Sequence, residues 1–212
     1  EEAQAAKREA RKALCIQWVS MIISVVLYFG IGTAVYTTSE PEGWSFNQAM
    51  YFQMVTMSTV GYGDLSPTTT GMKLFTLLWI FIGVIVVFSQ VGNCFAQLTS
   101  PITQFGRNLL EKLFPKNYID IDGDGDADFA YPRHPILGYG QGLLPSILLN
   151  AILQFSSAAV FVAIEGWGYG DAVYHCIVTS TTVGYGDMSI ATEEGRIWAS
   201  IHILFSVVMV AE

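Results

Sequence analysis

Charge is scarce in this sequence. Only 13% of the 212 residues are charged, whereas 52% are hydrophobic and the mean hydropathy is +0.44. An ordinary soluble domain carries about 25% charged residues, so the composition argues against one. The net charge of −8 argues against nucleic acid as a partner, because nucleic acid is itself a polyanion.

Cysteine and histidine are also rare. The three cysteines, an odd and unclustered number, lie in or beside apolar runs, which argues against a disulfide framework. The three histidines lack the spacing of a metal site, and no nucleophile–histidine–acid arrangement or phosphate loop is present. No apolar run has arginine at every third position, so no voltage sensor is expected. We therefore expect neither an enzyme nor a required cofactor.

Long uncharged runs occupy most of the chain. Residues 14–37, 74–102 and 141–164 contain no charged side chain, and about 20 apolar residues suffice for a helix to cross a bilayer. A fourth apolar run begins at Ile197 and continues to the end, so we expect a fragment that stops inside its last helix. The sequence predicts an all-α integral membrane protein in a lipid bilayer, with spans at about 14–37, 73–100, 142–164 and 195–212.

Positive charge is confined to a few places. Eight of the ten Lys and Arg residues lie before the first span or between the second and third spans. Cytoplasmic loops are enriched in Lys and Arg. The basic N-terminal segment 1–13 and the linker 101–140 are therefore predicted to be cytosolic, whereas the choice between plasma and organelle membrane stays open.

A repeat with an offset of 123 residues organises the chain. Residues 42–64 and 165–187 align without gaps, and 13 of 23 positions are identical. Each copy has the pattern of a long apolar helix, a short half-polar helix, a Gly-rich loop and another long apolar helix. The sequence predicts a first repeat at 14–100, with its short helix at 44–58 and its loop at 59–64. The second repeat is predicted at 141–212, with its short helix at 167–181 and its loop at 182–187.

The tripeptide Gly-Tyr-Gly occurs four times, and the repeat separates the copies. Those at 61–63 and 184–186 follow a Thr-Val pair at the end of a short helix. The copy at 168–170 falls at the start of the second short helix, where Gly and Asp serve as turn and cap residues. The copy at 138–140 has no partner in the other repeat and predicts a flexible approach to the third span.

The two Gly-rich loops have the chemistry of a K⁺ filter, and we name them filter loop 1 (59–64) and filter loop 2 (182–187). Glycine at alternate positions permits backbone angles barred to other residues. Successive carbonyls can then point to one axis and replace the water shell of a cation, as Thr-Val-Gly-Tyr-Gly loops do for K⁺. The predicted filter residues are Thr59, Val60, Gly61, Tyr62, Gly63, Thr182, Val183, Gly184, Tyr185 and Gly186.

The side chains around these loops have predicted places as well. Asp64 and Asp187 are expected at the outer mouth of the filter, where a carboxylate attracts cations, while the Val and Tyr side chains point away and pack as supports. Tyr51 and Tyr174 either hydrogen-bond these aspartates behind the filter or simply pack there.

Two complete filter signatures make the chain resemble the two-pore-domain potassium channels, over roughly residues 14–100 and 143–212. The resemblance implies that two chains form a homodimer whose four pore loops surround one pseudo-fourfold axis. It also implies that the first and third spans are outer helices and the second and fourth are inner helices. A gating hinge about twenty residues beyond each filter would fall at Gly83 and Ser206, so bending is expected to be asymmetric.

The chain also departs from parts of that family. Only residues 38–43 separate the first span from the first short helix, so the extracellular cap of animal members is expected to be absent, as in plant and protist members. Asp64 stands where acid-sensitive members have histidine. Glu212, which aligns with Ser89, is interpreted either as part of an acidic ring in the cavity or as a frayed end.

The linker has an aspartate at every second position from 120 to 128. Oxygen ligands at alternate positions and a glycine at the sixth are features of an EF-hand loop, and adjacent carboxylates repel one another without a cation. Tyr131 replaces the bidentate glutamate and Pro132 blocks an exiting helix, so half of an EF-hand with weak Ca²⁺ affinity is predicted, a solvated loop being the alternative. The predicted ligands are Asp120, Asp122, Asp124, Asp126 and Asp128.

The sequence as a whole predicts a potassium-selective channel that conducts K⁺ passively, with modulation by Ca²⁺ at the linker as a further hypothesis. One alternative is a non-conducting regulatory or calcium-sensing membrane subunit. Another is a pore-loop potassium transporter, although such transporters have four loops in one chain with a single filter glycine in each.

Overall fold

The computed structural model of the chain describes residues 2–39, 43–121, 129–132 and 135–211. Most of this length is helical. In chain order the elements are α1 (Glu2–Ser39), α2 (Phe46–Met57), α3 (Thr70–Phe81), the π-helix η1 (Ile82–Phe88), α4 (Ser89–Leu113), β1 (Lys116–Ile119), β2 (Phe129–Pro132), α5 (Pro135–Glu165), α6 (Tyr169–Ser180) and α7 (Glu193–Ala211).

Three stretches of the described chain are helices long and apolar enough to cross a membrane. They are Gln4–Ser39, Thr70–Leu113 and Leu143–Glu165, and the second joins α3, η1 and α4 into one rod. The 19-residue α7 is not among them. Large apolar side chains such as Ile16, Leu78 and Ile152 are exposed on the outer faces of these helices, as expected where lipid surrounds a protein. Apart from the short strands β1 and β2 the described chain is helical, so the protein is an integral membrane protein of the all-α class.

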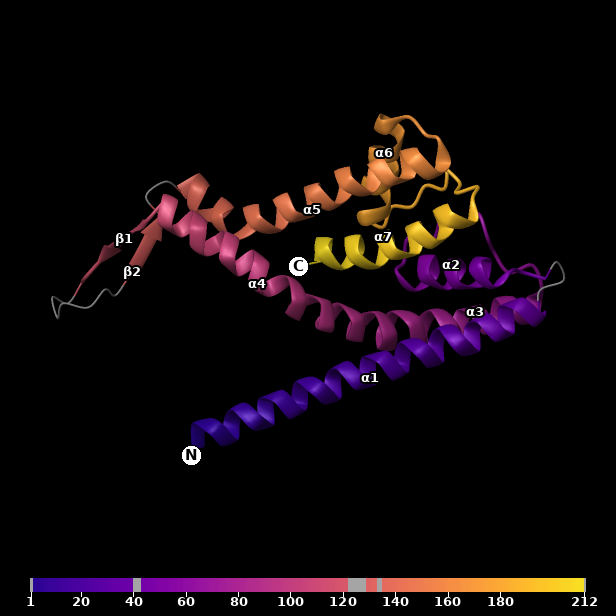
Figure 1. Ribbon diagram of the computed structural model, residues 1–212, viewed down its shortest axis with the longest axis horizontal. Coiled ribbons are helices and arrows are strands. Elements are labelled where there is room, and N and C mark those ends of the chain that lie inside the picture. The colour runs from indigo at the N-terminus through magenta and orange to yellow at the C-terminus, as the bar shows by residue number, and fades with distance from the viewer. Residues whose placement is uncertain (1, 40–42, 122–128, 133–134, 212) are drawn as a thin grey trace.

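The helices fall into two tandem repeats of the predicted plan. The first contains α1, α2 and the rod α3–η1–α4, and the second contains α5, α6 and α7. The short helices α2 and α6 lie towards one end of the molecule, and the β1–β2 hairpin projects from the opposite end (Figure 1). The repeats are interlocked, because α2 packs against α7 of the other repeat as well as against α1 of its own.

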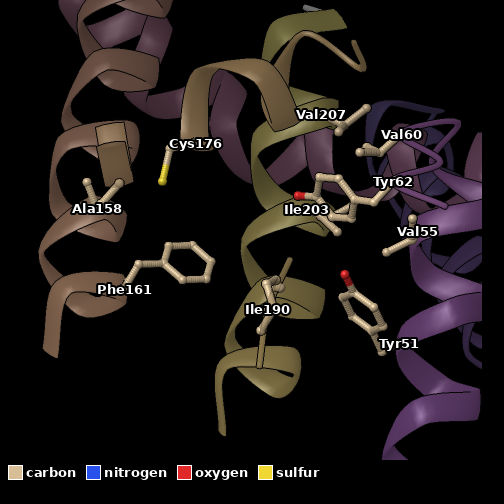
Figure 2. Close-up of a cluster of buried hydrophobic side chains, with 12 residues drawn as sticks. Tyr51, Val55, Val60, Tyr62, Ala158, Phe161, Cys176, Ile190, Ile203 and Val207 are labelled. Carbon is tan, nitrogen blue, oxygen red and sulfur yellow. The ribbon is translucent and has the colours of Figure 1, made fainter. Parts of the chain in front are cut away.

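A buried apolar cluster joins the two repeats behind filter loop 1. The first repeat contributes Tyr51 and Tyr62, and the second contributes Phe161, Ile190 and Ile203. Figure 2 shows Ile203 and Ile190 between the two tyrosines on one side and Phe161 on the other. A second cluster, around Tyr28, Tyr36 and Trp79, lies within the first repeat. Filter loop 1 is thus supported by side chains from both halves of the chain.

The short helices begin two residues after their predicted starts, at Phe46 and Tyr169. Ser45 caps α2 through a capping box, because its hydroxyl accepts from the Gln48 backbone N–H at 3.2 Å and the Gln48 side chain accepts from the Ser45 N–H at 2.9 Å. Gly168 is the N-cap of α6, and Asp171 lies in its first turn. The Gly-Tyr-Gly copy at 168–170 therefore belongs to a helix start, as predicted.

The linker differs from its prediction in two respects. Helix α5 begins at Pro135, so Gly138–Gly140 is helical and the predicted flexible approach is wrong. Proline fixes the backbone angle that the first helical position requires, and this start signal outweighs the glycines. The linker also contains an antiparallel hairpin in which Ile119 pairs with Phe129.

Candidate ion filter

The backbone of the two filter loops alternates in handedness. Every second residue has a positive φ, whereas the residues between them do not. The positive values are 62° at Thr59, 60° at Gly61, 80° at Gly63, 56° at Thr182, 51° at Gly184 and 69° at Gly186. Glycine adopts this region freely, but a β-branched threonine does so at a cost of about 1–3 kcal/mol. The surrounding structure therefore imposes the same backbone on both loops.

Each filter loop is attached in the same way to the C-terminal end of its short helix. The Gly61 N–H donates to the Val55 carbonyl at 3.2 Å, and the Gly184 N–H donates to the Val178 carbonyl at the same distance. The short helices thus fix the start of each loop. Helix C-termini carry partial negative charge, so α2 and α6 end with a potential that favours a cation beside the loops.

The aspartates that follow the loops are held by tyrosines of the short helices. The Tyr51 hydroxyl donates to Asp64 Oδ2 at 3.0 Å, and the Tyr174 hydroxyl donates to Asp187 Oδ2 at 3.0 Å. Of the two alternatives that the sequence allows, the structure has the hydrogen bond in both repeats. Burial and the Asp64 carboxylate raise the pKa of Tyr51, and the bond to Asp187 raises the pKa of Tyr174, so both phenols keep the proton that they donate.

The two filter loops differ in how their supporting side chains are covered. In filter loop 1, Val60 and Tyr62 are buried, with 4% and 8% of their surface exposed. In filter loop 2, Val183 and Tyr185 are 49% and 68% exposed. The predicted packing of these side chains as supports is therefore complete within one chain only for filter loop 1.

Tyr62 of filter loop 1 is bound by α6 of the other repeat. Its hydroxyl lies 3.2 Å from His175 Nε2 and hydrogen-bonds to the Thr179 hydroxyl. The Tyr62 and His175 rings are stacked with their centroids 5.3 Å apart. The sequence predicts no role for His175 beyond the absence of metal-site spacing. The signal available was its alignment with Phe52, which is an exchange of a polar for an apolar ring within the most similar segment of the repeats.

The filter loops lie directly against each other. A Cβ atom at Gly184 would overlap the Val60 carbonyl oxygen, and one at Gly186 would overlap the Tyr62 carbonyl oxygen. In contrast, a Cβ atom at Gly61 or Gly63 would meet nothing within 4 Å. One edge of filter loop 1 is therefore occupied by filter loop 2, and its glycine edge is open.

The two predicted hinge positions have different surroundings. Gly83 is buried in η1, where a Cβ atom would come within 2.5 Å of the Tyr28 hydroxyl and 2.9 Å of the Met57 Cβ. Ser206 is fully buried in the regular helix α7, and its hydroxyl donates to the Ile203 carbonyl at 3.5 Å. The inner helices are thus asymmetric at these depths, while a hinge role for either residue stays a prediction.

Most of the predicted calcium ligands fall outside the described residues. Asp120 is exposed just after β1, whereas Asp122, Asp124, Asp126 and Asp128 lie in the segment 122–128, and Glu212 is likewise outside. Within the described ranges no group of three or more His, Cys, Asp or Glu residues is placed to hold a metal ion. The calcium site therefore stays a prediction.

Comparison with known proteins identifies relatives across both repeats. A family described as "Ion channel" matches residues 21–100 and 147–211. "Two-pore potassium channel 5" of Arabidopsis thaliana is 28% identical over 90% of this chain and 48% of its own length. "Two pore potassium channel b" of Oryza sativa is 34% identical over 77% of the chain and 42% of its own. "Potassium channel subfamily K member 13" of Rattus norvegicus is 28% identical over 68% and 37%. The chain spans less than half the length of these three relatives.

Proposed function

We propose, from the premise that this chain belongs to the family of two-pore-domain potassium channels, that it forms the pore of a K⁺-selective channel. The observation that carries this proposal is the alternating positive φ at residues 59, 61 and 63 and again at 182, 184 and 186. Alternation of this kind turns successive carbonyl groups to the same side. Carbonyl rings of that geometry replace the hydration shell of K⁺ and allow it to pass down its electrochemical gradient.

The proposed mechanism involves no bond chemistry, and the family is one of ion channels rather than of enzymes. K⁺ would enter past Asp64 and Asp187, whose carboxylates raise its local concentration. It would then exchange water for carbonyl oxygens of Thr59–Gly63 and Thr182–Gly186 and leave into a cavity between the inner helices. The tyrosines that hold the two aspartates keep this mouth in place.

The functional unit that we propose is a homodimer with four filter loops around one axis. Its main support is the unequal cover of the two loops, because Tyr62 is buried by α6 whereas Tyr185 is 68% exposed. A second copy related by twofold symmetry would bring its α2 against filter loop 2 of the first copy. The open glycine edge of filter loop 1, at Gly61 and Gly63, would then meet filter loop 2 of that copy.

Two cavities beside the short helices support the same assembly. In the first repeat a cavity of about 190 Å³ lies between α1, the end of α2 and α4, and Leu204 of α7 closes one side. In the second repeat a cavity of about 410 Å³ lies beside Ile177, which aligns with Met54 in the first cavity. The residue aligned with Leu204 is Phe81, which is 63% exposed. Phe81 of the partner subunit would close the larger cavity.

The charge distribution supports one orientation, with the N-terminus and the central linker in the cytosol and the filter mouth on the opposite side. Modulation by Ca²⁺ at the linker is part of the proposal only as a hypothesis. Its structural support is the pairing of Ile119 with Phe129, the described residues that flank the acidic run. Calorimetry of the purified protein at millimolar Ca²⁺ tests it, and absence of binding would contradict it.

The test of the main proposal is K⁺ current in excised patches from cells that express the full-length protein. We expect a reversal potential that follows the K⁺ gradient and ignores Na⁺. Gly61→Ala should abolish selectivity, because alanine is strained at a φ of 60°. Gly170→Ala is the matched control, since this glycine is helical and a Cβ atom there meets nothing within 4 Å. Absence of current from a protein that reaches the membrane would favour the regulatory-subunit alternative.

A further inference from the structure

We propose that the two filter loops of each chain are held unequally, and that His175 is the positioning residue responsible for the difference. His175 gives Tyr62 of filter loop 1 a hydrogen bond for which filter loop 2 has no counterpart. This inference rests on the proposed function, because it concerns which of the four filter loops yields first.

The Tyr62 hydroxyl is buried against polar side chains of α6. Two buried polar side chains, His175 at 4% exposure and Thr179 at 0%, meet the Tyr62 hydroxyl. A phenol hydroxyl has one hydrogen to donate and lone pairs with which to accept. It can therefore use the His175 nitrogen and the Thr179 hydroxyl together, as donor to one and acceptor from the other. The bond spans 113 residues of sequence and fixes filter loop 1 to the other repeat.

The position of His175 has a matched counterpart in the first repeat. Residue 52 aligns with residue 175 and is phenylalanine. His175 packs against Trp167 with the ring centroids 4.9 Å apart, and Phe52 packs against the aligned Trp44 at 5.0 Å. The two rings thus occupy the same place on their short helices. They differ in that imidazole can hydrogen-bond to a phenol and a phenyl ring cannot.

This difference becomes a difference between filter loops in the proposed dimer. Tyr62 faces α6 of its own chain, so by the same geometry Tyr185 faces α2 of the second copy. There it would meet Thr56 of the partner subunit, which aligns with Thr179, and Phe52 of the partner subunit, which aligns with His175. Filter loop 2 would therefore hold its tyrosine by one hydrogen bond, whereas filter loop 1 holds its tyrosine by two.

The consequence is that the dimer would contain two filter loops held by two hydrogen bonds at the tyrosine and two held by one. Carbonyl rings repel one another when K⁺ leaves, and the supporting side chains resist the resulting distortion. The loops whose tyrosine has a single bond should distort first, so filter loop 2 of both copies would begin the loss of conduction. His175→Phe would make all four loops alike, and Phe52→His would give filter loop 2 the missing bond.

The experiment measures the rate at which current declines after external K⁺ is lowered, in the full-length channel. One buried hydrogen bond corresponds to about a fivefold change in the rate at which a single loop distorts. Phe52→His strengthens the loops that yield first, so it should slow the decline by about threefold, which guards against variants that merely fold poorly. His175→Phe leaves filter loop 2 unchanged and makes filter loop 1 an additional route, so it should speed the decline by less than about twofold, whereas His175→Gln, which keeps a hydrogen-bonding side chain, should decline like wild type.

The paired variants separate a hydrogen bond from packing. If His175→Phe conducts like wild type while His175→Gln declines quickly, the ring acts through its shape and the proposal is overturned. Spectra of the purified protein with ¹⁵N-labelled histidine provide a readout that needs no current. Tyr62→Phe should move the His175 Nε2 resonance, and an unmoved resonance overturns the inference even if the protein conducts nothing. If the wild-type protein carries no K⁺ current but Tyr62→Phe still moves the His175 resonance, the proposed function is contradicted and the hydrogen bond is not.

Discussion

The two repeats tie their helices together at aligned positions with different side chains. In the first repeat the side-chain amide of the buried Gln53 in α2 donates to the Thr33 hydroxyl of α1 at 3.0 Å. The Trp79 indole of α3 donates to the side-chain carbonyl oxygen of Gln53 at 3.2 Å. One amide thus joins the outer, short and inner helices. The packing is tight, because a Cβ atom at Gly32 would meet both the Gln53 and the Trp79 side chains.

In the second repeat the same positions are arranged otherwise. Cys176 aligns with Gln53 and His202 aligns with Trp79. His202 lies 2.9 Å from the Gln154 carbonyl oxygen. Ser157 of the outer helix accepts from the Trp198 indole of the inner helix at 3.0 Å and hydrogen-bonds to Cys176 of the short helix. The filter backbone is nevertheless the same in both repeats. The comparison teaches that different polar contacts can hold the same helix framework.

The largest expected effect on stability comes from removing the Gln53 side-chain amide, which joins three helices of the first repeat. Gln53→Leu leaves the Trp79 indole and the Thr33 hydroxyl without their partner, and each buried unsatisfied group costs about 1–3 kcal/mol. We expect a clear loss of thermal stability for the purified channel, measured by unfolding in detergent. Cys176→Ala, at the aligned position, is the control and should lower the stability much less. Equal losses would contradict the idea that α2 is tied more firmly than α6.

The tyrosines at the filter mouth give a prediction of intermediate size. Tyr51→Phe and Tyr174→Phe each remove one hydrogen bond to an aspartate, at 3.0 Å in both repeats. Within one chain Tyr51 is 1% exposed and Tyr174 is 41% exposed. In the proposed dimer the second copy covers Tyr174, so Tyr174→Phe, which loosens the loop that yields first, should speed the decline of current at low K⁺ by about fivefold, and Tyr51→Phe should speed it less. A large effect of Tyr51→Phe with none for Tyr174→Phe would count against that cover.

The smallest expected effect concerns a hydrogen-bonded pair of side chains in the first repeat that is replaced by two alanines in the second. The Tyr36 and Thr76 hydroxyls hydrogen-bond at 2.9 Å, and alanines stand at the aligned positions 159 and 199. Thr76→Val removes this one hydrogen bond and should cost about 0.5–1.5 kcal/mol. Unfolding of the purified protein in detergent measures the loss, and a Thr76→Val variant as stable as wild type would refute the argument.

The sequence predicted the features that depend on local pattern. Three of the four predicted spans match long apolar helices, and the helix start at Gly168 follows from its cap residues, whereas α7 is not among the helices apolar and long enough to cross a membrane. It did not predict that His175 would meet Tyr62, because that contact depends on the docking of α6 against the filter loop of the other repeat. The helical start of α5 was missed because Pro135 and Gly138 give opposing local signals.

The π-helix η1 changes how the two inner helices should be compared. A π-turn accommodates one residue more than an α-turn, and each residue of an α-helix advances by about 100° around its axis. The rod beyond Phe88 is therefore rotated by about a quarter turn relative to an unbroken α-helix. Residues 123 apart, such as Val87 and Val210, are aligned in sequence but differ in azimuth, since Val87 is buried whereas Val210 is exposed. A cysteine scan of the cavity that pairs residues by number alone would compare different faces of the two helices.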